Sequence, residues 1–225
     1  MNGWICFGDS HAFCFDSVME THYFPASSAR GLRNIYSVSK ANDRMRRIIS
    51  NNKTASKYIF FFGKVDIDFI INHHFNRVDN FNISEFIDNT VGGYVEFIKS
   101  LPIKPTQVHI CELPVGHVSD ENLLDILNSE FNHNCVASFL SENYERLKTY
   151  TKVLSLEQRN IHLMYFNKQL KALCEENSFK FLEINKHWSA GPEGPIVIPL
   201  KYLTEDKSNH HLDNSIHKLF LSELT

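Results

Sequence analysis

Four short apolar runs along the chain have the pattern of buried strands. They lie at residues 4–7, 58–62, 108–111 and 179–184, and a glycine or a polar residue follows each of them. A continuous apolar run without alternation is typical of an inner strand of a parallel sheet, because both faces of such a strand are covered. We therefore expect four strands of this kind.

Segments with helical spacing alternate with these runs. Residues 41–51 are basic and amphipathic, and residues 84–100 repeat apolar positions every three or four residues. A helix is expected after Ser119, which suits an N-cap, and the longest helix over residues 155–177, whose first four residues are close to a capping box. Residues 214–224 are expected to form a short last helix. This alternation predicts an α/β sheet covered by helices on both faces.

The chain is interpreted as one domain over residues 1–225, because no internal repeat or low-complexity tract divides it. Residues 118–150 carry the weakest pattern, and we interpret them as a helical insertion that roofs the site. Residues 188–204 hold Gly or Pro at five positions and are expected to form an irregular loop. Long loops at strand ends often carry function in such folds.

Composition narrows the class of protein. Hydrophobic residues make up 43% of the 225 residues and charged residues 22%, which suits a packed core. With 23 basic and 26 acidic residues the net charge is −3, and this balance argues against a nucleic-acid partner. No apolar stretch approaches the roughly 18 residues of a membrane span, and the start of the chain lacks the basic segment of a secretory signal.

Cofactor and metal motifs are missing from the sequence. The five cysteines are odd in number and form no CxxC pair, so we expect reduced thiols and a cytoplasmic protein. Neither a glycine-rich phosphate loop nor a His-Glu-x-x-His or Cys/His box is present. The sequence therefore predicts no nucleotide cofactor and no bound metal.

The candidate chemistry lies at the two ends of the chain. Gly8-Asp9-Ser10-His11 directly follows the first expected strand, and ligands of doubly wound sheets bind beyond the carboxyl ends of the strands. A serine on the turn into the first helix would expose its hydroxyl there, with its own N–H near the positive end of that helix. Near the other end of the chain stands His210-His211-Leu212-Asp213, just before the last helix.

These blocks resemble those of the SGNH (GDSL-type) hydrolase family. Gly8-Asp9-Ser10-His11 is similar to the nucleophile block, and Gly31 is the best match to the glycine that follows the second strand. The third block of the family, Gly-x-Asn-Asp, corresponds to Gly63-Lys64-Val65-Asp66, so Val65 replaces the asparagine.

The fourth block of the family is Asp-x-x-His, often followed by Leu. His211 and Leu212 match its end, whereas Ser208 stands where the Asp is expected and Asp206 is the nearest acid upstream. The resemblance implies a three-layer αβα sandwich, with a flavodoxin-like, doubly wound and mainly parallel sheet of about five strands.

The resemblance also implies acyl transfer through a serine. Ser10 Oγ would attack an ester carbonyl, His211 would take its proton and return it to the leaving group, and Asp206 would orient the imidazole. The backbone N–H groups of Ser10 and Gly31 would meet the negative charge that develops on the carbonyl oxygen.

Val65 is the main departure from the family pattern. The asparagine normally adds a third oxyanion donor, and losing one such donor costs about 10²–10³ in rate. Three interpretations stay open. Another group, Lys64, Asn34 or Arg30, replaces the donor; the enzyme is slow and holds a preferred substrate tightly; or the site binds without catalysis.

Four residues are expected to contact substrate, namely Asp66, Lys64, Arg30 and Trp188. Asp66 either lines the pocket or caps a loop, and Asp68 is expected to be a solvated loop acid. Arg30 begins a basic segment that extends to residue 47 and is either a solvated face or a docking place for an anionic substrate such as an acidic sugar. Trp188 is a candidate for stacking on a sugar ring.

The sequence therefore predicts a serine-dependent ester hydrolase that removes an O-acyl group from a carbohydrate, with a small-molecule or glycan ester as its partner. Variant blocks of the form Gly-acid-Val-Asp are associated with bacterial polysaccharide loci, so the same resemblance implies an O-acyltransferase of polysaccharide biosynthesis as an alternative. A second alternative is a non-catalytic glycan-binding protein with a degenerate site, which Val65 and Ser208 favour.

Overall fold

The fold is built around one five-stranded parallel sheet. The computed structural model describes residues 3–25, 27–34, 39–129, 150–188, 198–204 and 211–224. The strand order is β2-β1-β3-β4-β5, and every pair of neighbours is parallel. This is the doubly wound order with its switch point between β1 and β3, so the predicted α/β class is confirmed. The strands are β1 (Trp4–Gly8), β2 (Glu20–Tyr23), β3 (Lys57–Phe61), β4 (Val108–Cys111) and β5 (Lys180–Leu182).

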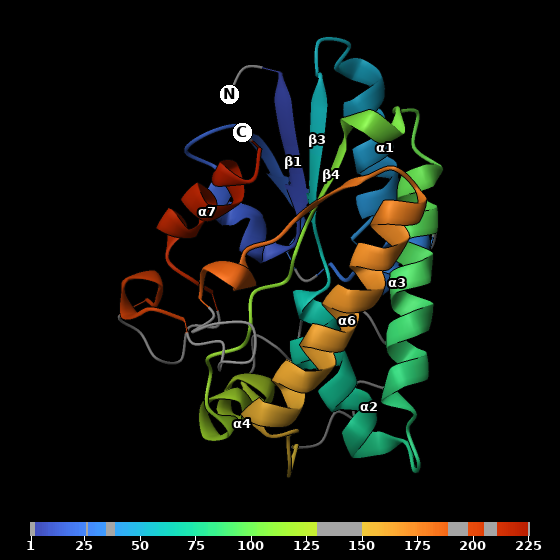
Figure 1. Cartoon of the computed structure of the whole chain (residues 1–225). Coiled ribbons are helices and arrows are strands. Elements are labelled where there is room, and N and C mark those ends of the chain that lie inside the picture. Colours follow the sequence, from blue (N-terminus) through green and yellow to red (C-terminus); the bar gives the residue numbers. More distant parts are fainter. Residues whose placement is uncertain are drawn as a thin grey trace.

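Helices cover both faces of the sheet (Figure 1). On one side lie α1, α3 and α6, of which α3 and α6 pack directly against each other. On the other side the short 3₁₀ helix η1 (Ser10–Phe15) contacts η8 (Asn214–Ile216), which leads into α7. Within the described residues the α-helices are α1 (Ala41–Asn51), α2 (Ile71–Arg77), α3 (Ile83–Lys99), α4 (Asp120–Asn128), α6 (Leu156–Glu176) and α7 (His217–Ser222).

Two helix starts predicted from the sequence, at Ser119 and Ser155, are confirmed. Ser119 Oγ accepts a hydrogen bond from the N–H of Asn122 at the start of α4. Ser155 and Gln158 form a reciprocal capping box at the start of α6. Each cap satisfies backbone N–H groups that the first turn of a helix leaves without partners. None of the described helices combines the length and apolarity needed to cross a membrane.

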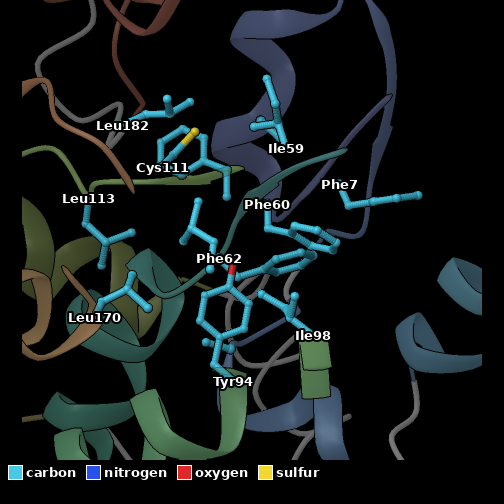
Figure 2. Packing of buried hydrophobic residues seen from close by; sticks show 14 of the residues in the cluster. Phe7, Ile59, Phe60, Phe62, Tyr94, Ile98, Cys111, Leu113, Leu170 and Leu182 are labelled. Carbon is cyan, nitrogen blue, oxygen red and sulfur yellow. The ribbon is translucent and has the colours of Figure 1, made fainter. Parts of the chain in front are cut away.

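The core beneath the site is aromatic. Figure 2 shows Phe7 of β1, Phe60 of β3 and Phe62, which directly follows β3, beside Tyr94 and Ile98 of α3. The ring centroids of Phe7 and Phe60 lie 5.7 Å apart, and those of Phe62 and Tyr94 lie 6.1 Å apart. Close-packed rings of this kind hold the carboxyl ends of β1 and β3 in fixed positions.

Three segments differ from the sequence predictions. The edge strand β2 was not predicted, because its residues Glu-Thr-His-Tyr are partly exposed and form no apolar run. The last helix is divided into η8 and α7. After β3 the chain forms one π-helical turn, Asp66–Ile70, that continues into α2. Of the expected insertion over residues 118–150, α4 is present, and residues 130–149 lie outside the described part.

Candidate active site

Ser10 stands at the carboxyl end of β1, as the first residue of η1. The preceding residue fixes this turn. The Asp9 N–H donates to the carbonyl of Phe61 on β3 at 3.1 Å, and the Asp9 carboxylate accepts the N–H of His11 at 2.9 Å. The serine is therefore held at the switch point of the sheet, where doubly wound folds bind their ligands.

His211 reaches Ser10 from the other end of the chain. Its Nε2 lies 2.8 Å from Ser10 Oγ, within hydrogen-bond distance, although the two residues are 201 positions apart. Short backbone contacts hold this segment in place. Leu203 and Leu212 form an antiparallel bridge, and the N–H of Asp213 donates to the carbonyl of Tyr202 at 2.9 Å.

The environment of His211 keeps its imidazole neutral at neutral pH. Burial lowers the pKa of His211 from 6.5 to about 4, and the positive forms of His11 and His117 act in the same direction. The carboxylates of Asp9 and Asp68 partly oppose this effect. A neutral imidazole 2.8 Å from a hydroxyl can accept its proton, so the pair has the geometry of a nucleophile and its general base.

Ser10 and His211 open into a pocket of about 420 Å³. No lysine or arginine is among the pocket residues that the structure describes. The size suits a small organic ligand, and the lining favours an uncharged group next to Ser10. The apolar part of the wall includes Phe13, Cys14, Tyr23, Phe61, Pro114 and Ile216.

The two backbone donors expected for an oxyanion have different surroundings. Within the described residues the Ser10 N–H makes no hydrogen bond. The Gly31 N–H, in contrast, donates to the carbonyl of Ser28 at 3.1 Å and to Ser28 Oγ at 2.9 Å. Gly31 is also not among the described pocket residues. The Gly31 N–H is thus engaged within its own turn.

Asp66 holds the loop that contains Gly31. Its carboxylate is fully buried and accepts the N–H of Ala29 at 2.7 Å and that of Arg30 at 3.3 Å. Burial raises the pKa of Asp66 to about 7, although these two hydrogen bonds act against the rise. Arg30 itself is exposed, 3.3 Å from a ring nitrogen of His74. Of the two interpretations of Asp66, the structure shows the loop cap.

Lys64 and Asp68 form a buried ion pair. Lys64 Nζ lies 3.2 Å from the Asp68 carboxylate, and the side chains are only 3% and 7% exposed. The expectation that Asp68 is solvated was wrong, because the turn after β3 places the two side chains four residues apart on one helical face. Lys64 is not among the described pocket residues.

Val65 points into a small apolar cluster. It is 7% exposed and belongs with Phe69, Leu123, Leu127 and Tyr150, which join the turn after β3 to α4. The position of the family's asparagine is thus used for packing. The other candidate for a replacement donor, Asn34, is exposed at the end of η2 (Arg30–Arg33).

The remaining predicted residues lie in different places. Trp188 is 5% exposed and belongs to the main core, with its ring 6.2 Å from that of Tyr202. That position leaves little of the indole for stacking on a sugar. Asp206, the candidate acid, lies outside the described residues.

Sequence reasoning gave no role to His11, Phe13 or Tyr23, although all three line the pocket. The proximity of His11 and Phe13 to Ser10 along the chain was the available signal. Tyr23 carried none, because the strand that places it was not predicted. In the described part of the chain no three His, Cys, Asp or Glu side chains gather as a metal site would require.

The chain is similar to known proteins in structure and not in sequence. No protein-family model matches the chain, and no curated protein does. Among solved structures, a GDSL-like lipase from Bacteroides thetaiotaomicron has a TM-score of 0.51 at 10% identity, with 98% of this chain and 84% of the lipase covered. A Bacteroides fragilis protein that carries the name acylhydrolase has a TM-score of 0.50 at 13% identity, with 98% and 83% covered. These likenesses show that the chain shares the fold of both proteins.

Proposed function

We propose that the chain is a serine-dependent ester hydrolase of the SGNH type. The observation that carries this proposal is the 2.8 Å contact between Ser10 Oγ and His211 Nε2 in a pocket at the switch point of the sheet. The likeness in fold to a GDSL-like lipase and to a protein named acylhydrolase supports it. The Gly-Asp-Ser-His block at the end of β1 supports it further.

The reaction follows from the atoms present. Ser10 Oγ attacks the ester carbonyl while His211 Nε2 takes the hydroxyl proton, and the Ser10 N–H faces the resulting oxyanion. Collapse of this intermediate breaks the bond to the alcohol, which leaves with the proton from His211. Water then attacks the carbonyl carbon of the acyl-enzyme while His211 takes one of its protons. Collapse of this second intermediate breaks the bond to Ser10 Oγ, which recovers the proton from His211, and the acid leaves. Asp206 is proposed to orient the far nitrogen of His211.

The proposed substrate is an O-acylated carbohydrate. The exposed rings of Phe13 and Tyr23 stand at the pocket, where an aromatic face can pack against the apolar face of a sugar. Thr204 and Asn214 add polar groups to the same wall. Since no described pocket residue is a lysine or an arginine, the proposal favours a neutral sugar over an acidic one.

A non-catalytic glycan-binding protein is the second candidate. Two observations favour it. Val65 is packed in an apolar cluster, and the Gly31 N–H is engaged within its own turn. Ser10 N–H is then the one predicted oxyanion donor that remains available among the described residues. Fewer donors mean weaker stabilisation of the tetrahedral intermediate.

Covalent labelling tests the proposal. A fluorophosphonate probe should label the wild type at Ser10, and Ser10→Ala should abolish labelling. Hydrolysis of a small aryl acetate should be lost in both Ser10→Ala and His211→Ala. Matched controls are Ser17→Ala, which removes an exposed hydroxyl beyond η1, and His217→Ala, which removes an imidazole of α7.

The two candidates predict opposite results. If the wild type neither labels nor turns over aryl acetate while it still binds an acylated glycan, the binding protein is the correct interpretation. An acyltransferase would label like a hydrolase, but an added sugar acceptor would divert the acyl group from water to the sugar hydroxyl.

A further inference from the structure

A second carboxylate–imidazole pair lies beside Ser10 and His211. His11 Nδ1 is 2.9 Å from Asp9 Oδ1, and the residues are 7% and 1% exposed. The same oxygen accepts the backbone N–H of His11, so the carboxylate is held from two directions. A buried carboxylate is costly unless it is hydrogen-bonded, and this one is fixed against an imidazole.

The ring of His11 in this second pair contacts the ring of His211, the proposed general base. The centroids of His11 and His211 lie 4.7 Å apart with 39° between the ring planes, and both residues line the pocket. The ring of Phe61 packs near His11 at 6.4 Å. His11 is thus held between the buried carboxylate of Asp9 and the imidazole that takes the serine proton.

We propose that Asp9 and His11 form a positioning pair that holds the His211 ring against Ser10 and stabilises the imidazolium that forms during acylation. This inference rests on the proposed serine hydrolase function. The block Gly8-Asp9-Ser10-His11 would then supply the nucleophile and also part of the electrostatic stabilisation of the general base. In a serine triad the stabilising carboxylate instead hydrogen-bonds to the imidazole nitrogen that faces away from the serine.

The charge of the Asp9–His11 pair explains how it acts on His211. The His11 Nδ1–H donates to Asp9 Oδ1 at 2.9 Å, so the carboxylate of Asp9 is the negative charge of the pair. When His211 takes the proton of Ser10, its new positive charge lies one ring away from that anion. No bond to His11 forms or breaks, and the attraction lowers the energy of the charged intermediate.

Other groups also face His211. Asp68 lies on the turn after β3 and attracts the imidazolium, while His117, after β4, opposes it when charged. From the start of η1, the Asp9 carboxylate attracts the imidazolium, and His11 opposes it when charged. A variant of Asp9 or His11 leaves Asp68 and His117 unchanged, so the contribution of the pair can be measured separately.

The test is the rate of fluorophosphonate labelling at Ser10 between pH 2.5 and pH 9, a range that contains both the pKa of His211 at about 4 and a downward shift from it. Asp9→Asn keeps an acceptor for the His11 N–H but removes the charge. It should move the midpoint of the rise with pH downward and lower the plateau by about tenfold, because one pKa unit corresponds to a tenfold change in base strength. His11→Phe keeps a ring against His211 and should lower the plateau similarly.

The double variant distinguishes this role from packing. If Asp9 acts through His11, Asp9→Asn adds no further loss to His11→Phe, whereas independent structural effects would add. The matched controls are Glu20→Gln and His22→Phe. These residues form an acid–imidazole pair with the same spacing at 2.8 Å, but it is solvent-exposed on β2, and both variants should keep the wild-type profile.

Three outcomes would overturn the inference. They are a wild-type profile in Asp9→Asn, a wild-type profile in His11→Phe, or losses that add with an unmoved midpoint. Absence of labelling in the wild type would instead refute the proposed function. Nitrogen-15 NMR of the histidines in the wild type provides a test without variants. His11 should carry its proton on Nδ1, which lies 2.9 Å from Asp9 Oδ1, and a proton on Nε2 instead would also overturn the inference.

Discussion

Replacing Lys64 with methionine is expected to lower the melting temperature strongly. The ammonium of Lys64 and the carboxylate of Asp68 lie 3.2 Å apart, and both side chains are almost completely buried. Methionine has a similar length and fills the same space, but it leaves the Asp68 carboxylate without its cation. A buried charge that loses its partner keeps the full cost of desolvation.

The size of the effect follows from this burial. Breaking a buried ion pair from one side costs about 3–5 kcal/mol of unfolding free energy. In a chain of this length, 1 kcal/mol changes the melting temperature by about 2–4 °C, so Lys64→Met should lower it by about 6–20 °C. Replacing both partners with apolar residues is often neutral, so Lys64→Met combined with Asp68→Leu should recover most of the loss.

Calorimetry at neutral pH measures these changes. Lys99→Met is the matched control, because Lys99 and Glu96 form a pair 2.7 Å apart that is 43% and 70% exposed. Exposed pairs contribute about 0–1 kcal/mol, so this control should change little. A melting temperature of Lys64→Met close to that of the wild type would refute the reasoning, as would a double variant no more stable than the single one. A raised KM at unchanged stability would instead support the substrate-binding interpretation of Lys64.

Two further predictions concern the switch point and the pH dependence of stability. A Cβ at Gly8 would lie 2.7 Å from the carbonyl oxygen of Phe61. Gly8→Ala should therefore lower the free energy of unfolding by about 1–3 kcal/mol and the melting temperature by about 2–12 °C. An unchanged melting temperature in calorimetry would contradict this prediction. Burial lowers the pKa of His73, His109 and His211 from 6.5 to about 4, so between these values the unfolded chain binds protons that the folded chain does not. The melting temperature should therefore fall from pH 6.5 to pH 4. Asp66, whose pKa burial raises to about 7, opposes the change with one proton against the three of these histidines. A melting temperature that rises toward pH 4 would contradict this expectation.

The sheet could be predicted where its strands are buried on both faces. The residues of β3 and β4 are almost entirely buried, and a continuous apolar run is the direct consequence. The edge strand β2 has one neighbour and partly exposed faces, so its sequence carries no such run. It pairs with β1 through backbone hydrogen bonds, which any residue except proline can donate.

The site shows the same division between local and distant signals. The turn at Ser10 follows from a strand end and a capping aspartate, both of which are adjacent in sequence. The contact between the rings of His11 and His211 joins residues 200 positions apart and leaves no periodic pattern in the sequence. The burial of Asp68 depends on the π-helical turn after β3, which composition does not specify.

Val65, which stands where the SGNH pattern has an asparagine, packs against α4. The apolar face of this helix presents Leu123 and Leu127 to the turn after β3, and Val65 completes the cluster. An asparagine at this position would put an amide among apolar side chains, at a cost of about 1–3 kcal/mol for each polar group left without a partner. Stability of the α4 contact and an amide donor at position 65 are therefore competing demands on one side chain. The structure has the apolar contact, so under the proposed function a second oxyanion donor besides the Ser10 N–H would come from another element of the chain.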